Sequence, residues 1–185
     1  MKRANGDLER GTADGALAPD DPAPPAVDLV TGLVSREVFD GQLTRSLERS
    51  WRTPTSVAVL LVGVRDLSLL SARFGRDVAD EVLGVAAARL QSGVREVDLL
   101  ARLDEDTFGM VLEIDPSHPQ PELMATHVAQ RLVSRFAEPL STTCGGLSIT
   151  AVTGVAVADS IAFDAGELIL RARVAMDAGP LSQPD

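Results

Sequence analysis

Apolar residues recur along the chain with two different periods, and these periods predict its secondary structure. Residues 56–64 (SVAVLLVGV) form a continuous apolar run, which is typical of a central strand covered on both faces. Residues 75–91 instead carry apolar side chains at helical spacing. The first run predicts a buried strand, and the second predicts an amphipathic helix.

The remaining apolar segments complete an alternating order. Residues 97–103 (VDLLARL) and 107–114 (TFGMVLEI) are predicted to pair as a hairpin. Further elements are expected as a helix from an N-cap at Ser35 to Trp51, helices over 119–136 and 165–178, and a long strand over 147–158 that follows a turn at Gly145–Gly146. From residue 56 onwards the order is strand, helix, strand, strand, helix, strand. We therefore expect an α/β protein of the α+β kind, with a ferredoxin-like, palm-type antiparallel sheet flanked by helices mostly on one face.

The first 26 residues differ in composition from the rest. They are rich in Gly, Ala, Pro and Asp and end in APDDPAPPA, which offers no apolar face to pack. We expect a disordered acidic, Pro/Ala-rich tail over 1–26, one folded domain over 27–179 and a C-terminal tail over 180–185.

Composition and charge exclude several classes of function. The net charge of −10 argues against a nucleic-acid partner, because neutralising phosphates requires a surplus of Lys and Arg. The single cysteine, Cys144, cannot form an internal disulfide. No apolar run is long enough to span a bilayer, so we expect a cytoplasmic protein without a membrane anchor.

Five short motifs, in order, resemble those of the GGDEF family, the diguanylate cyclase domain. They are DLVTGLVSREVF at 28–39, GRDVADEVL at 75–83, ARLDEDTFGMVL at 101–112, ITAVTGVAVA at 149–158 and LILRARVAM at 168–176. The resemblance covers about residues 28–178 and implies the GGDEF variant of the ferredoxin-like fold.

The same resemblance implies that the cyclase chemistry is lost. Such cyclases join two GTP molecules into cyclic di-GMP, using two carboxylates for metal and two glycines beside the phosphates. Here the metal aspartate falls on Gly63, the guanine-reading Asn on Ser71, the glycine pair on Asp104–Glu105, the second acid on Thr107 and a helical Asp on Arg173, which leaves Asp80 and Asp106. Each new carboxylate near a phosphate adds repulsion of roughly 1–3 kcal/mol per charge pair. We expect no enzyme activity, no catalytic residue, no metal and no cofactor, and we interpret Asp80, Asp104, Glu105, Asp106 and Thr107 as an active-site remnant.

A second motif points to ligand binding. Arg95 and Asp98 form the chain's one RxxD, and by resemblance they occupy the family's inhibitory product site for an intercalated dimer of cyclic di-GMP. An Arg fork suits phosphate oxygens or the guanine O6 and N7 atoms, and a carboxylate suits the guanine N–H donors. The expected ligand-binding residues are Arg95, Asp98, Leu99, Arg102 and, through a gapped match, Arg131.

Two hypotheses stay open. In the first, the domain is a cyclic di-GMP receptor, in which the ligand can cross-link two copies. In the second, the domain is a ligand-independent interaction module that binds an unidentified protein partner or forms a homodimer. An exposed Arg and Asp three residues apart are as well explained by a solvated salt bridge worth about 0–1 kcal/mol.

Overall fold

The computed structural model describes residues 26–53, 55–95, 98–158 and 164–179. The predicted tails lie outside these residues, apart from Ala26. The elements are α1 (Arg36–Ser50), β1 (Ser56–Val64), α2 (Leu67–Phe74), α3 (Arg76–Gln91), β2 (Leu99–Arg102), β3 (Thr107–Ile114), α4 (Pro121–Ser134), β4 (Leu140–Thr142), β5 (Gly145–Leu147), β6 (Ala151–Ala158) and α5 (Ala165–Asp177). None of the described helices is long and apolar enough to cross a bilayer.

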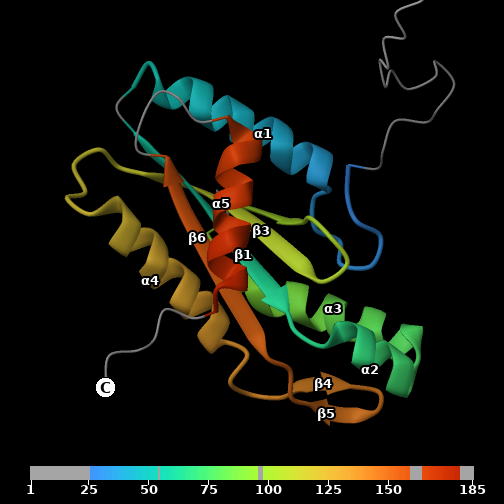
Figure 1. Cartoon of the computed structure of the whole chain (residues 1–185). Helices are drawn as coiled ribbons and strands as arrows, with labels where there is room; N and C mark the ends of the chain where they lie inside the picture. Colours follow the sequence, from blue (N-terminus) through green and yellow to red (C-terminus); the bar gives the residue numbers. More distant parts are fainter. Residues whose placement is uncertain (1–25, 54, 96–97, 159–163, 180–185) are drawn as a thin grey trace, which may run out of the picture.

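The main sheet has the order β2-β3-β1-β6, and all of its pairs are antiparallel (Figure 1). Counted along the chain, this is the ferredoxin-like arrangement with the first and third of the sheet's strands in the centre. The α+β prediction is confirmed. The predicted hairpin of β2 and β3 and the buried strand β1 are confirmed with it.

The structure adds one helix and shortens one predicted strand. The helix predicted over 75–91 is confirmed as α3. A separate helix that was not predicted, α2, precedes it, and Gly75 between them has a φ of +93° that interrupts the helical backbone. The strand predicted over 147–158 begins only at Ala151, since Gly145–Leu147 pairs back with β4 as a small separate hairpin. The apolar run through Leu147 and Ile149 carried no sign of this break.

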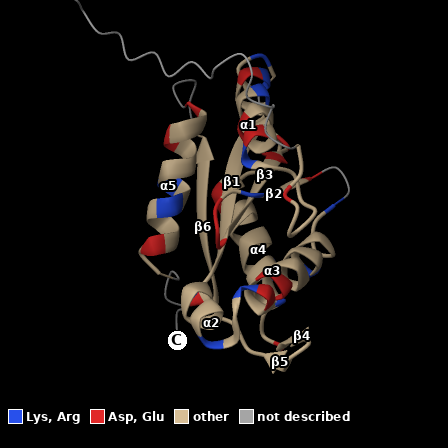
Figure 2. Ribbon diagram, turned by 90° about the vertical axis from the view of Figure 1, so that its right-hand side faces the viewer, with Lys and Arg blue, Asp and Glu red and all other residues tan. Residues whose placement is uncertain are grey.

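The side chains of β1 alternate between two cores. Ala58, Leu60 and Val62 pack with residues of α3 and α4, whereas Val57, Val59 and Leu61 pack with residues of α1 and α5. The expectation of helices mostly on one face was therefore wrong. Figure 2 shows α5 and α3 on opposite sides of the sheet. Because the side chains on both faces of β1 are buried in a core, the strand needs apolar residues at successive positions, which explains its continuous apolar run.

The helix α5 packs closely against β6 at one glycine. A Cβ built at Gly154 would lie 2.0 Å from the Ala172 carbonyl oxygen and 2.5 Å from the Met176 backbone nitrogen. Both atoms belong to the backbone of α5, so neither can move aside without displacing the helix. The absent side chain at Gly154 sets the distance between α5 and the sheet.

We expect Gly154→Ala to lower the free energy of unfolding by about 1–3 kcal/mol or more, because α5 must move away from β6. Gly41→Ala is the matched control. A Cβ at Gly41, on the exposed face of α1, meets only the Arg45 side chain at 3.8 Å, so alanine should stabilise that helix by about 0.5–1 kcal/mol. Urea denaturation of the three proteins measures both effects, and equal stability of wild type and Gly154→Ala would contradict the close packing.

Candidate functional site

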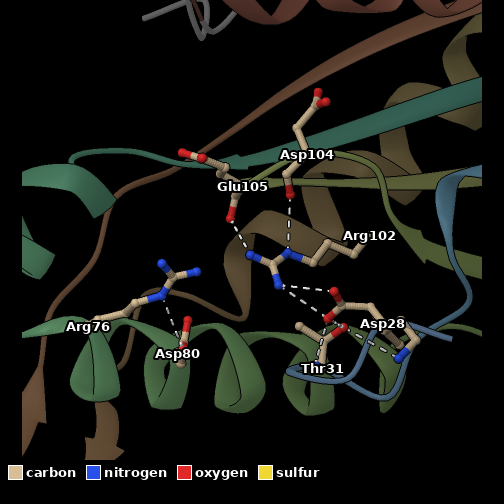
Figure 3. A network of polar contacts seen from close by, with 8 residues as sticks. Asp28, Thr31, Arg76, Asp80, Arg102, Asp104 and Glu105 are labelled. Atoms are coloured by element: carbon tan, nitrogen blue, oxygen red, sulfur yellow. Dashed lines mark hydrogen bonds and ion pairs between the residues drawn. The ribbon is translucent and has the colours of Figure 1, made fainter. Parts of the chain in front are cut away.

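Arg102, at the end of β2, donates hydrogen bonds to the backbone of the acidic turn in the β2–β3 hairpin. Its Nε donates to the Asp104 carbonyl at 3.1 Å and its Nη2 to the Glu105 carbonyl at 2.8 Å. Its Nη1 donates to both carboxylate oxygens of Asp28, at 3.2 and 3.1 Å. Figure 3 shows the guanidinium directed at these groups, while the side chains of Asp104 and Glu105 point away from it. Only 15% of the Arg102 side chain is exposed, and its hydrogen bonds are made within the domain.

Asp28 joins the hairpin to the N-terminal turn. Its Oδ1 accepts from the backbone N–H of Thr31 at 2.8 Å and from the Thr31 hydroxyl at 2.7 Å. Burial alone would raise the pKa of the Asp28 carboxyl, but the hydrogen bonds from Thr31 and Arg102 outweigh burial and lower that pKa below its ordinary value. The ionised carboxylate is therefore the form that the fold stabilises.

The side chain of Asp104 lies between two arginines from different helices. Oδ1 accepts from Arg36 Nη1 of α1 at 3.0 Å, and Oδ2 pairs with Arg173 Nη2 of α5. The three side chains are 33–44% exposed, so each pair contributes little, about 0–1 kcal/mol. Their main effect is electrostatic, because the charge of Asp104 is neutralised by Arg36 and Arg173.

The surroundings of Gly63, which we expected to occupy the position of the metal aspartate, do not fit a divalent cation. A Cβ at Gly63 would lie 3.1 Å from Met176 Sδ, so Met176 fills the space that a longer side chain would need. Asp106 Oδ1 accepts from the hydroxyl of Thr107, and Arg173 lines the same cavity of about 120 Å³. Mg²⁺ prefers several oxygen ligands and no neighbouring cation. Nowhere in the described ranges do three or more His, Cys, Asp or Glu side chains gather in a way that could hold a metal.

The remnant residues separate into two groups. Asp80, Glu105 and Asp106 line a cavity of about 500 Å³ between α2, α3 and the turn, together with Arg76, which lies 3.9 Å from Asp80. Asp104 instead faces its arginines, and Thr107 is buried. Carboxylates thus dominate the charged lining of this cavity, since the charge of Arg102 is already paired with Asp28.

The RxxD residues line a different cavity. Arg95, Asp98 and Leu99 border about 450 Å³ of space that is completed by residues 32–34, Gln91, Val94 and Leu100. Asp98 Oδ2 accepts from the backbone N–H of Arg95 at 3.1 Å, so the two residues of the motif are joined by a local hydrogen bond. The two residues between them lie outside the described part of the chain.

Two arginines near the C-terminal end of α4 reach the loop that leads into this motif. Arg131 Nη2 donates to the Gly93 carbonyl at 3.4 Å, and Arg135 Nη1 donates to the Ser92 hydroxyl at 3.0 Å. Arg131 therefore lies beside the RxxD loop, as expected. Arg135 was missed, although its place one helical turn after Arg131 puts both on the same face.

Arg102 does not join this group. It was expected to be free for a base or a phosphate, but four hydrogen bonds hold it to Asp28 and the hairpin turn. The sequence offered no sign of its partner, because Asp28 is 74 residues away.

Comparisons with known proteins identify the family of the chain. The chain matches the family model "Diguanylate cyclase, GGDEF domain" over residues 25–179. This match covers most of its length, so the chain belongs to the GGDEF family.

Individual relatives are similar at low identity. The cyclic di-GMP phosphodiesterase NbdA of Pseudomonas aeruginosa is 26% identical over 149 residues, which cover 80% of this chain but only 18% of NbdA. The solved GGDEF domain of TpbB (YfiN), also from Pseudomonas aeruginosa, has a TM-score of 0.74 and 27% identity over 82% of this chain and 87% of that one. The GGDEF domain of DgcB from Caulobacter crescentus, solved in complex with cyclic di-GMP, has a TM-score of 0.72 over 87% of this chain and 90% of that one. At 18% identity, the DgcB comparison establishes the fold alone.

We expect Asp28→Asn to lower the free energy of unfolding by about 1–3 kcal/mol at pH 7, because charge-assisted hydrogen bonds to Arg102 and Thr31 are lost. Since the pKa of Asp28 is lowered in the folded state, its stabilisation is complete above the ordinary value of 3.8 and is lost as the pH falls through the lowered pKa. Urea titrations of both proteins from pH 7 downward test this. A variant as stable as wild type at pH 7 would exclude a structural role for the pair.

Proposed function

We propose that this GGDEF domain is a catalytically inactive receptor for cyclic di-GMP, which it binds through Arg95, Asp98 and Leu99 with help from Arg131. The observation that carries this proposal is the separation of two cavities. One is lined by carboxylates at the expected nucleotide position. The other is lined by the RxxD pair, and Arg131 of α4 donates to the Gly93 carbonyl, next to Val94 in its lining.

The loss of activity is supported by the charges at the hairpin turn. Phosphate would have to approach Glu105, Asp106 and Asp80 with no metal to offset their repulsion. The Asp104–Arg173 pair also supports the loss of activity, because Arg173 lines the cavity at Gly63 and places a positive charge where a cyclase would hold metal. In this proposal, the paired Asp104 and the carboxylates of the cavity take the place of the groups that hold triphosphate in a cyclase.

Ligand binding is supported by the chemistry of the RxxD cavity. Within the described ranges, no hydrogen bond or ion pair occupies the guanidinium of Arg95, and Asp98 uses one carboxylate oxygen to accept from the Arg95 backbone. An arginine fork and a carboxylate at this spacing can bind the Hoogsteen and N1–N2 edges of guanines. Arg131 would add positive charge for the phosphodiesters. Arg102 has a structural role in this proposal, since it orients the hairpin instead of contacting ligand.

Titration calorimetry with cyclic di-GMP tests the receptor proposal. We expect wild type to bind and both Arg95→Ala and Asp98→Ala to weaken binding by roughly tenfold or more, because each removes charge-assisted hydrogen bonds. Arg95→Lys keeps the charge but loses the fork, so it should bind less tightly than wild type.

Arg45→Ala is the control for the change in net charge. Arg45 is exposed on α1, outside the residues that line the cavity, and its loss should leave binding unchanged. No heat from wild type at tens of micromolar ligand would instead favour the ligand-independent interaction module.

Incubation with GTP and Mg²⁺ tests the loss of activity separately. We expect no cyclic di-GMP above background by chromatography, because Gly63 and Thr107 supply no carboxylate for metal. A GGDEF domain with measured cyclase activity serves as the positive control. Product above background that grows with enzyme concentration would contradict the proposal.

A further inference from the structure

The end of α3 and the loop that follows it form one wall of the RxxD cavity. Gln91, the last residue of α3, and Val94 both line the cavity, whereas Ser92 and Gly93 between them are not among its lining residues. Those two residues instead contact arginines near the end of α4. The loop therefore lies between α4 and the cavity, so a side chain of α4 can act on the cavity without entering it.

Arg135 makes close contacts with this loop. Its Nη1 donates to the Ser92 hydroxyl at 3.0 Å, and that hydroxyl in turn donates to the Arg89 carbonyl at 2.8 Å. A Cβ built at Gly93 would lie 3.0 Å from Cδ and 3.1 Å from Cζ of Arg135, and nearer still to its Nε. This Nε is buried and has no hydrogen-bond partner among the described residues. The guanidinium of Arg135 thus lies directly against the Gly93 backbone, in the space that a side chain at this position would need.

The backbone that carries Arg135 is itself fixed to α3. Arg89 of α3 donates from Nη1 to the carbonyls of Arg135 at 3.0 Å and Glu138 at 2.6 Å, and from Nη2 to that of Pro139 at 2.9 Å. Carbonyls at and beyond the end of a helix have no partner within it, so these bonds satisfy groups that need one. Arg89 therefore joins α3 to the end of α4, and Arg135 joins α4 back to the residue after α3.

The loop has few other contacts that could hold it in place. The Val94 N–H donates to the Gln91 carbonyl at 3.4 Å, and the Arg95 N–H donates to the Asp98 carboxylate at 3.1 Å. Arg95 is exposed. A short segment with few buried contacts and exposed hydrogen bonds opens easily, so the contacts with Arg135 matter for its conformation.

We propose that Arg135 is a positioning residue for the RxxD site, which holds the loop over 92–95 from outside the cavity and thereby preorganises Arg95 for ligand. This inference rests on the proposed receptor function and deepens it. A loop that is already held in its binding conformation loses less conformational freedom when ligand binds, so affinity rises. The two arginines of α4 then have different roles, because Arg131 contributes charge to the ligand and Arg135 acts through the loop.

Gly93→Ala is the most informative variant, because it displaces the Arg135 guanidinium without changing any charge. Gly93 does not have a positive φ, so its backbone accepts alanine. In titration calorimetry we expect Gly93→Ala and Arg135→Ala each to weaken cyclic di-GMP binding by about threefold to tenfold, as for loss of one hydrogen bond of ordinary net strength. Arg135→Lys keeps the charge but loses the planar group, so its affinity should fall between those of wild type and Arg135→Ala. Gly41→Ala, the same change on the exposed face of α1, is the control and should leave affinity unchanged.

The double variant Gly93→Ala/Arg135→Ala tests whether both changes act on one contact. It should bind no more weakly than Arg135→Ala alone, because the added Cβ then meets no guanidinium. Fully additive losses would contradict a shared contact. Urea denaturation of the same variants separates positioning from packing, since a purely structural role would lower the free energy of unfolding and leave the affinity of the folded protein unchanged.

Hydrogen exchange without ligand gives a second readout. The amides of Val94 and Arg95 should exchange faster in Gly93→Ala and Arg135→Ala than in wild type, while amides in the middle of α3 stay unchanged. If Arg135→Ala fails to fold, Gly93→Ala supplies both measurements. Unchanged affinity in Gly93→Ala, or unchanged exchange at these two amides, would overturn the positioning role and leave the receptor proposal intact. No binding by wild type would overturn the receptor proposal, and the positioning role with it.

Discussion

The structure depends on the burial of β1 between two cores. Its neighbours β3 and β6 occupy both of its edges, and its side chains alternate between α3 and α4 on one face and α1 and α5 on the other. A buried Val or Leu side chain contributes about 1.5–3 kcal/mol, and almost every residue of β1 is buried. The positions of the hairpin turn and of both sheet edges follow from the register of this strand.

The charges around the hairpin turn support the proposed loss of cyclase chemistry within a retained GGDEF fold. Arg102 donates hydrogen bonds to backbone carbonyls of the turn, and Arg36 and Arg173 pair with the Asp104 carboxylate. In a family whose cyclases approach phosphate with glycines at this turn, carboxylates paired with arginines make a stable turn that disfavours anions. The contacts of Arg102, Arg36 and Arg173 stabilise this turn.

Arg95 and Arg102, which were both expected to bind ligand, have different neighbours in the structure. Arg95 precedes β2 and borders an open cavity, whereas Arg102 ends the same strand and is bound by Asp28.

The sequence by itself determined the elements with a strong period. The continuous run of β1, the helical spacing of α3 and the hairpin of β2 and β3 were predictable, because burial on one or two faces leaves a regular pattern. It also determined the family, through motifs at 28–39 and 101–112. The break before Ala151 was not predictable, since apolar residues continue across Leu147 and Ile149 and only pairing decides where a strand begins. The separate helix α2, which ends at Gly75, was not predicted either. The partners of Arg102, Asp104 and Gly154 were decided by the tertiary structure alone, because each contact joins segments that are distant in the chain and leaves no local pattern.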